Sequence, residues 1–334
     1  MRPTHASSPH APSLAQQDAP FFAVSLNAVI VTATPEEPRI LVLRTEQGRL
    51  EALPAGPLTP DHRTLEAGLR AWVEQQTDQH LGYVEQLYTF GDRSRTGPDR
   101  AVAPQGLAIA YLALVREARP AGSMQAGWQN WHRYFPWEDW REGRPGILEP
   151  IRQKLLAWAA LAPTDAARRL RRERTELTFG FADLGWSDER VLERYELLYE
   201  AGLVPEAWRD RGEALPDTAA LVPGTPMALD HRRMLATAIA RLRGKIKYRP
   251  VVFELMPPAF TLLQLQRTVE TLAGVRLHKQ NFRRLVEAQG LVEETGESTT
   301  ETGGRPARLV RFRREVLLER PAPGVRLPRQ LSAP

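Results

Sequence analysis

One succession of helix and strand signals in the C-terminal part of the chain constrains its fold most strongly. Apolar residues recur there with helical spacing in three stretches, and two stretches with strand character follow. The helices are predicted over His231–Arg249, Thr261–Ala273 and His278–Gln289, and the strands over Leu291–Thr295 and Ala307–Arg313. Helix, helix, turn, helix, strand, loop, strand is the order of a winged helix-turn-helix, which we predict for residues 226–320.

The charge of this region differs from that of the rest of the chain. Residues 231–334 contain 20 Lys and Arg against 9 Asp and Glu, a net charge of +11. Residues 1–230 contain 25 against 31, a net charge of −6. A basic module joined to a mildly acidic body favours a polyanion as its partner, although a basic surface that is only solvated would give the same counts.

The predicted helix His278–Gln289 has two chemically different faces. Phe282, Leu285 and Val286 fall on one face, which we expect to pack, and polar side chains fall on the other. Arg makes bidentate hydrogen bonds to the edge of guanine, and Gln makes them to the edge of adenine, so the polar face suits readout of the DNA major groove. We add the N-cap Thr261 of the preceding helix and two arginines near the second strand, Arg305 and Arg308. The predicted DNA-binding residues are therefore Thr261, Lys279, Gln280, Asn281, Arg283, Arg284, Arg305 and Arg308.

The loop between the two predicted strands is acidic. It carries Glu293, Glu294, Glu297 and Glu301 on or beside it, so we do not expect its tip to lie deep against phosphate. A helix-turn-helix that contacts only proteins is the alternative to a DNA reader.

The helix His231–Arg249 has a narrow apolar stripe. Leu235, Ile239, Leu242 and Ile246 recur at i, i+4, i+7 and i+11, which predicts a dimer seam against the same helix of a second subunit. Two subunits paired in this way would hold their recognition helices about one DNA turn, roughly 34 Å, apart.

The rest of the chain divides into further parts. Residues 1–18 are predicted to be a disordered tail, and residues 321–334 a second tail. Residues 19–120 alternate strand patterns around one helix, Thr64–Thr77, which predicts an α+β domain. Residues 121–225 hold seven of the eight Trp and helical patterns at Ile147–Ala162 and Ser187–Ala201, with Ser187 as N-cap. They predict a helical insertion or linker with an aromatic core, and stacking on bases is the alternative.

Composition excludes several classes of protein. The chain has no Cys, which rules out a disulfide scaffold, a thiolate zinc site and a Cys nucleophile. Its longest apolar run, Phe21–Ala33, is shorter than the ~20 residues of a membrane span. No secretory signal pattern is visible, so we expect a soluble cytoplasmic protein.

Residues 53–77 resemble the loop–helix–loop of the Nudix hydrolases. Aligned on Gly56, the family box places its Mg²⁺-binding carboxylates on the predicted helix, where this chain reads Arg70-Ala-Trp-Val-Glu74-Gln-Gln-Thr77. Ala71 and Gln75 replace two of the three carboxylates, and only Glu74 remains. One carboxylate is a poor Mg²⁺ site, so the resemblance implies a lapsed hydrolase with no metal and no catalytic residues.

A domain of this kind is expected to keep a nucleotide cavity. Arginine suits phosphate and an aromatic ring stacks on a base, so basic and aromatic residues near the ends of the predicted strands are candidates. The predicted ligand-binding residues are Arg44, Arg70, Glu74, Tyr88, Phe90, Asp92 and Arg95. The alternative is that the aromatic residues belong to the core and the arginines are solvated.

The two modules together resemble the NrtR family of Nudix-related transcriptional regulators. The likeness lies in Tyr83–Asp92, in Leu229-Asp230-His231 with the helix that follows, and in Phe260–Gln266 through Asn281–Arg284 to Gly304-Arg-Pro306. It implies an α+β fold with a Nudix-like α/β/α sandwich, a Trp-rich helical insertion and a winged helix-turn-helix.

The same resemblance implies a function. It indicates a homodimeric bacterial repressor of NAD-metabolism genes that binds a palindromic operator in duplex DNA. Its effector would be ADP-ribose or a related nucleotide, and it would need no cofactor. A Mg²⁺-dependent hydrolase of ADP-ribose or NADH that relies on Glu74 is the alternative.

Overall fold

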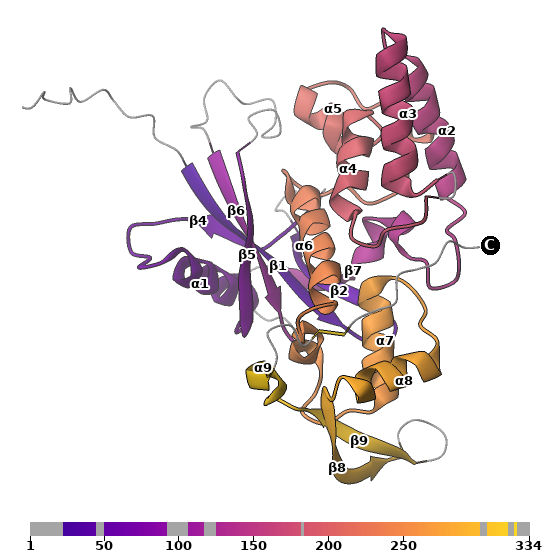
Figure 1. Cartoon of the computed structure of the whole chain (residues 1–334). Coiled ribbons are helices and arrows are strands. Elements are labelled where there is room, and N and C mark those ends of the chain that lie inside the picture. The colour runs from indigo at the N-terminus through magenta and orange to yellow at the C-terminus, as the bar shows by residue number, and fades with distance from the viewer. Residues whose placement is uncertain are drawn as a thin grey trace, which may run out of the picture.

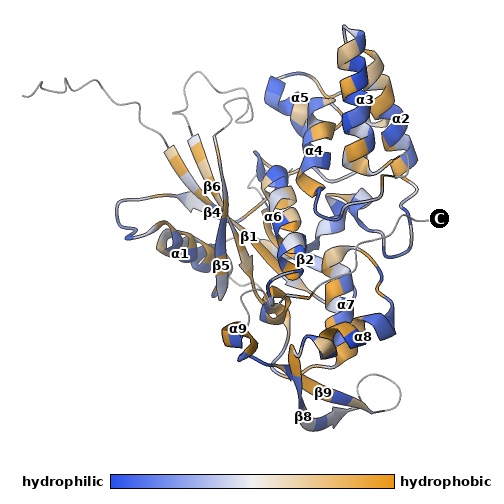
Figure 2. Cartoon of the chain, in the orientation of Figure 1, coloured by the Kyte–Doolittle hydropathy of each residue, from blue (hydrophilic) through white to orange (hydrophobic). Residues whose placement is uncertain are grey.

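The structure is a computed structural model that describes residues 23–44, 50–91, 106–116, 125–181, 184–300, 306–319 and 324–325. A seven-stranded sheet forms its centre. The strands are β1 (Ala23–Ala33), β2 (Pro38–Arg44), β3 (Glu51–Ala52), β4 (Ala55–Pro57), β5 (Tyr83–Phe90), β6 (Gly106–Leu114) and β7 (Ala126–Asn130). β1 pairs in parallel with β6 and antiparallel with β2 and β4. Both β1 and β6 are nearly continuous apolar runs, as a strand covered on two faces requires (Figure 2).

Helices cover the two faces of this sheet (Figure 1). On one face lies α1 (Leu65–Thr77), whose Leu69 and Val73 pack on Leu26 and Ile109. The Thr64 side chain accepts a hydrogen bond from the backbone N–H of Ala67, so the N-cap begins the helix where the sequence predicts it. The other face is covered by α6 (His231–Ile246).

The position of α6 contradicts the predicted dimer seam. Leu235, Ile239, Leu242 and Ile246 are each 0% exposed within a single chain. They belong to the core cluster that α6 forms with the sheet, α4 and α7. The stripe is therefore already covered by the chain's own elements and is closed to a partner helix.

The sheet extends further along the chain than predicted. β7 lies inside the segment predicted to be a helical insertion, and Trp128 on it is paired with Leu41 of β2. A boundary at residue 120 would therefore cut the sheet. The helices of the insertion begin later, and they are α2 (Leu148–Ala160), α3 (Asp165–Phe179), α4 (Val191–Glu200) and α5 (Pro205–Arg211).

Two helices of this segment, α3 and α5, were not predicted, and α4 begins later than predicted. Arg190, not Ser187, precedes α4. In α3 only Thr175 and Phe179 are buried, and charged residues, most of them arginines, fill more than half of the helix, so it has too few apolar residues to stand out in the sequence.

The C-terminal elements follow the predicted order. They are α7 (Leu262–Ala273), α8 (Lys279–Ala288), β8 (Val292–Thr299), β9 (Ala307–Phe312) and a short α9 (Val316–Glu319). β8 and β9 form a separate two-stranded antiparallel sheet, the wing. Short 3-10 helices connect the larger elements at Trp131–Arg133, Pro136–Glu138, Thr218–Ala220 and Val251–Leu255.

One core runs through all of these parts. The larger cluster of buried apolar residues joins the α6 face of the sheet, the insertion and the winged helix. It includes Val29 of β1, Tyr195 of α4 and Val286 of α8. Among the described residues, no helix has the length and apolarity that a membrane crossing demands.

Candidate nucleic-acid interface and ligand pocket

Helix α8 presents a polar face to solvent. Phe282 and Val286 are 3% and 0% exposed and hold the helix on the core, and Leu285 packs beside them. The predicted DNA-contact residues of this helix are all exposed, namely Lys279, Gln280, Asn281, Arg283 and Arg284. The structure therefore brings these five together on one surface, with the chemistry that base and phosphate contacts need.

The turn between α7 and α8 is tightly held. Gly274 ends α7 with φ +72°, a left-handed conformation that favours glycine. A Cβ at this position would collide with the backbone oxygen of Glu138, so the turn lies directly against the chain that follows the sheet. The Gly274 carbonyl in turn accepts a hydrogen bond from the Trp140 N–H at 2.7 Å.

Thr261 does not reach this surface. Its side chain is 2% exposed and accepts from the backbone N–H of Gln264 at 3.2 Å, while the Gln264 side chain accepts from the Thr261 N–H at 2.7 Å. This reciprocal capping box begins α7. The predicted DNA contact by Thr261 is wrong, because burial and capping already occupy its hydroxyl group.

The wing balances its charges internally. Arg308 Nη1 lies 2.6 Å from Glu294 Oε1, and Arg311 Nε lies 2.7 Å from Glu293 Oε1. These pairs are largely exposed, so water screens them and phosphate could replace either carboxylate. Arg305 lies outside the described residues.

Arg70 and Glu74 of the Nudix-like helix each have a partner within the chain. Arg70 donates to Glu66 and to the carbonyls of Leu81 and Gly82, which ties α1 to the following loop. Glu74 is about half exposed, and its carboxylate lies 3.4 Å from the ring of His80. Within the described ranges, no three His, Asp or Glu side chains are grouped so that they could hold a metal ion.

Strand β4 is closed against α1 by other side chains. The Trp72 indole covers Gly56, where a Cβ would collide with the ring, and donates to the Pro57 carbonyl at 2.8 Å. Gln76 bonds both the N–H and the carbonyl of Ala55. These contacts fill the space between α1 and β4.

A pocket of about 120 Å³ opens on the other face of the sheet. It lies where the starts of β1 and β6, the end of β5 and the N-terminus of α6 meet. Its lining is Ser25, Asn27, Phe90, Gly106, Leu107, Ala108, Leu229, Asp230, His231 and Met234. The Phe90 and Tyr88 rings meet edge-on, with 5.2 Å between their centroids. The Arg233 guanidinium lies 5.1 Å from the centroid of the Phe90 ring.

His231 is a fixed neutral group beside this pocket. Its Nδ1 accepts a hydrogen bond from the Leu53 N–H at 3.0 Å, so Nε2 carries the proton. Burial, and the positive charge of Arg209 to a smaller extent, lower the pKa of His231 to about 4. The sequence signalled this residue only as part of the Asp230-His231 pair, and it did not point to Asn27.

The predicted ligand residues do not form one site. Tyr88 and Phe90 lie near the pocket, with Tyr88 59% exposed. Arg70 and Glu74 lie on α1, across the sheet from them. Arg44 is exposed at the end of β2. Asp92 and Arg95 lie outside the described residues.

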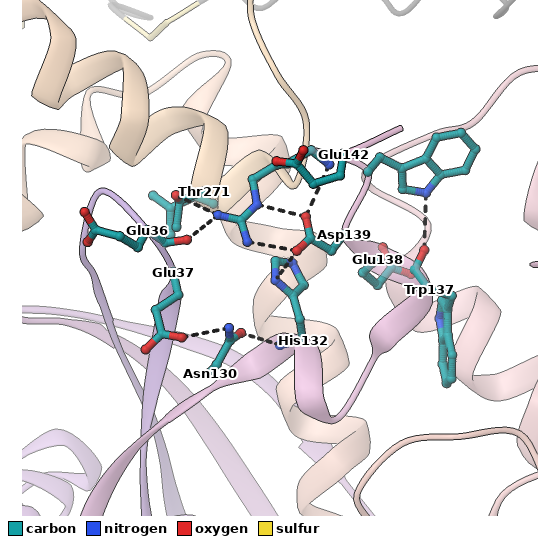
Figure 3. A network of polar contacts seen from close by, with 12 residues as sticks. Glu36, Glu37, Asn130, His132, Trp137, Glu138, Asp139, Glu142 and Thr271 are labelled. Carbon is teal, nitrogen blue, oxygen red and sulfur yellow. Dashed lines mark hydrogen bonds and ion pairs between the residues drawn. The ribbon is translucent and has the colours of Figure 1, made fainter. Parts of the chain in front are cut away.

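A polar network joins the sheet to the winged helix (Figure 3). Arg141 binds both carboxylate oxygens of Asp139 at 2.8 Å and reaches the Glu36 carbonyl and the Thr271 hydroxyl group. Burial lowers the pKa of His132, whose ring lies 3.4 Å from Asp139, to about 3. Hydrogen bonds from Arg141, together with the electrostatic effects of His132 and Arg141, outweigh burial and lower the pKa of Asp139 to about 2. The β1–β2 turn is thereby attached to α7.

Comparisons with known proteins agree with this geometry. A family model described as the NrtR DNA-binding winged helix domain matches residues 252–312. The curated "ADPR responsive transcriptional repressor NtrR" of Acinetobacter baylyi is 45% identical over 86 residues, which are 26% of this chain and 34% of that protein. The chain thus matches about a third of the length of this relative.

Two solved structures share the overall fold. The crystal structure of Shewanella oneidensis NrtR has a TM-score of 0.51 and 19% identity, and the match covers 88% of this chain and 95% of that one. A MutT/nudix family protein from Enterococcus faecalis has a TM-score of 0.53 and 15% identity, with 90% of each chain covered. Residues 252–312 therefore match the model of the NrtR winged helix domain, and the chain as a whole has the α+β fold that these two structures share.

Proposed function

We propose that this protein is a ligand-responsive transcriptional regulator, a repressor that binds duplex DNA through α8. One observation carries the proposal: within a domain that matches the NrtR winged helix, Lys279, Gln280, Asn281, Arg283 and Arg284 form one exposed face on a helix seated by Phe282 and Val286. The name of the 45% identical relative describes a repressor responsive to ADPR, which supports the same function.

The DNA-binding test starts from duplexes of random sequence, so it does not depend on a known operator. Duplexes are selected from the random pool with the full chain, and affinity is then measured by fluorescence anisotropy on a selected and a scrambled duplex at several salt concentrations. We expect Arg284→Ala to weaken binding to the selected duplex by about 1–3 kcal/mol, roughly 5- to 150-fold, if Arg284 contacts a base. Arg172→Ala, which removes an exposed arginine of α3 far along the chain, is the control and should bind as the wild type does. Failure to enrich any duplex would refute the proposal.

The effector is proposed to be ADP-ribose, bound at the Phe90 pocket. A pocket of about 120 Å³ accommodates one part of a nucleotide, with the remainder lying over the exposed Tyr88 ring. Aromatic faces stack on bases, and the uncharged His231 can donate from Nε2. We propose that the NAD-derived nucleotide shifts the position of α6, which runs from this pocket to the winged helix.

Calorimetric titration with ADP-ribose tests the pocket. Tyr88→Ala should weaken binding, since the Tyr88 ring is exposed beside Phe90 and its removal leaves the buried core unchanged. Tyr248→Ala changes a comparably exposed tyrosine at the end of α6 and should leave the affinity unchanged. Equal affinities for the two variants would remove the Phe90 pocket from the proposal.

The remaining parts of the proposal concern catalysis and assembly. The Nudix-like domain is proposed to have lost hydrolysis. Trp72 and Gln76 close β4 against α1, and among the described residues no three His, Asp or Glu side chains that could hold a metal ion are grouped around Glu74. It would act in the bacterial cytoplasm as a homodimer on a palindromic site, paired through a surface other than the covered stripe of α6. Multi-angle light scattering of the chain, free and on a selected duplex, measures that assembly.

A further inference from the structure

A buried ionic triad lies where the sheet, the insertion and the winged helix meet. Glu138, which follows β7, is 1% exposed and is contacted by Arg194 of α4 and Arg243 of α6, which are 0% and 1% exposed. Arg194 binds both carboxylate oxygens, with Nε at 2.6 Å and Nη2 at 2.9 Å. Arg243 Nη1 binds Oε2 at 2.6 Å.

Arg243 also holds backbone that leads to the recognition helix. Its Nε donates to the carbonyl of Leu272 at the end of α7, and its Nη2 donates to the Glu138 carbonyl at 3.2 Å. The same guanidinium would collide with a Cβ on Gly274, so it forms the floor of the turn before α8.

The insertion joins this arrangement through the loop before α4. Arg194 donates to the Ser187 carbonyl at 2.9 Å, and Arg243 to the Asp188 carbonyl at 3.1 Å. The Arg194 guanidinium also lies 3.7 Å from the ring centroid of Trp186. Across a groove of about 1020 Å³, this loop faces Asn281, Phe282 and Leu285 of α8.

We propose that Glu138 and Arg194 are positioning residues, through which the helical insertion fixes the recognition helix relative to the sheet. The proposal rests on the proposed DNA-binding function and gives the insertion a part in it. Burying charged groups costs free energy unless all of their hydrogen bonds and ion pairs are made, and these three side chains make them in one geometry. The triad therefore disfavours arrangements in which the sheet, the insertion and the winged helix are displaced from one another. An insertion that only enlarged the core would not need charged groups there.

The test uses Arg194→Met, which removes the bonds that Arg194 makes to Glu138 and to the Ser187 carbonyl. It leaves Glu138 paired with Arg243, and Arg243 bonded to the Asp188 carbonyl. The matched control replaces a second buried pair, Glu206 and Arg232, which are 2% and 0% exposed. That pair joins α5 to α6, and Arg232 donates to the Tyr134 carbonyl rather than to the turn before α8. The control variant is Glu206→Gln/Arg232→Met.

Two readouts separate positioning from stability. Hydrogen–deuterium exchange should become at least 5-fold faster over residues 262–288 in Arg194→Met, with exchange in the sheet unchanged, and binding to the selected duplex should weaken at least 5-fold. The control should lower the melting temperature without either effect. Wild-type exchange and affinity in Arg194→Met, or equal changes in the control, would overturn the inference.

Two further outcomes also bear on the triad. If Arg194→Met does not fold, Arg194→Lys is used, which keeps the charge, loses the two-point contact with Glu138 and should give a smaller change of the same sign in both readouts. If the wild type binds no duplex, the proposed function fails, whereas faster exchange confined to residues 262–288 still supports positioning by the triad.

Discussion

The stability of this protein should depend on pH through His231. Its pKa is lowered to about 4 in the folded chain from 6.5, so the ring stays neutral in the fold and takes up a proton on unfolding at any pH between these values. The contribution of the neutral His231 ring to the free energy of unfolding is therefore fully present above pH 6.5 and is lost as the pH falls toward 4. Linkage at 1.36 kcal/mol per pKa unit gives a loss of about 2 kcal/mol between pH 7 and pH 5.

Urea denaturation at pH 7, 6 and 5 measures this loss, and His231→Asn isolates it. The Asn side-chain oxygen can accept from the Leu53 N–H as Nδ1 does, but it does not titrate. We expect the free energy of unfolding of the variant to fall about 2 kcal/mol less than that of the wild type over this range. His278→Asn, the same change at an exposed histidine, should retain the wild-type pH dependence. An unaltered pH dependence in His231→Asn would refute the reasoning, since the slope would then come from other groups such as His132.

Three more outcomes follow from the winged helix and the Nudix-like helix. Thr261→Ala removes one half of the capping box and should destabilise the chain by about 1 kcal/mol in urea denaturation, with no loss of DNA affinity at temperatures where it is folded. Phe282→Ala should cost about 3–5 kcal/mol because the ring is buried, whereas Leu318→Ala at an exposed position should cost little; similar losses would show that α8 is not seated on its apolar face. With ADP-ribose and millimolar Mg²⁺ we expect no phosphate-ester product by chromatography, and turnover that Glu74→Gln abolishes would restore the hydrolase alternative.

The winged helix was predictable because its signals are local. The capping box at Thr261, the Gly274 turn and the two-faced pattern of α8 each act within a few residues, so the order of elements and the exposed face of α8 follow from the sequence. The same holds for α1, where Thr64 and the spacing of Leu69 and Val73 define the helix. Helix α3 shows the limit of this reasoning, because its burial is confined to Thr175 and Phe179.

The ligand residues could be nominated from the sequence but not brought together. Arg70 and Tyr88 both have side chains suited to nucleotide binding, but they lie on opposite faces of the sheet. The pocket beside Phe90 instead includes Asn27 and His231, which come from distant parts of the chain. The spacing along a chain does not determine which face of a sheet a neighbouring element covers.

The sequence by itself determined the helices of the C-terminal module, the wing and the polar face of α8. Only the tertiary structure decided what covers the apolar stripe of α6: Leu235, Ile239, Leu242 and Ile246 pack on the chain's own core. A stripe at i, i+4, i+7 and i+11 gains the same free energy from any apolar surface that removes it from water, be it a partner helix or a sheet. The hydrophobic effect is non-directional. The periodicity of a helix therefore identifies the face that must be buried, but the tertiary structure determines which surface covers that face.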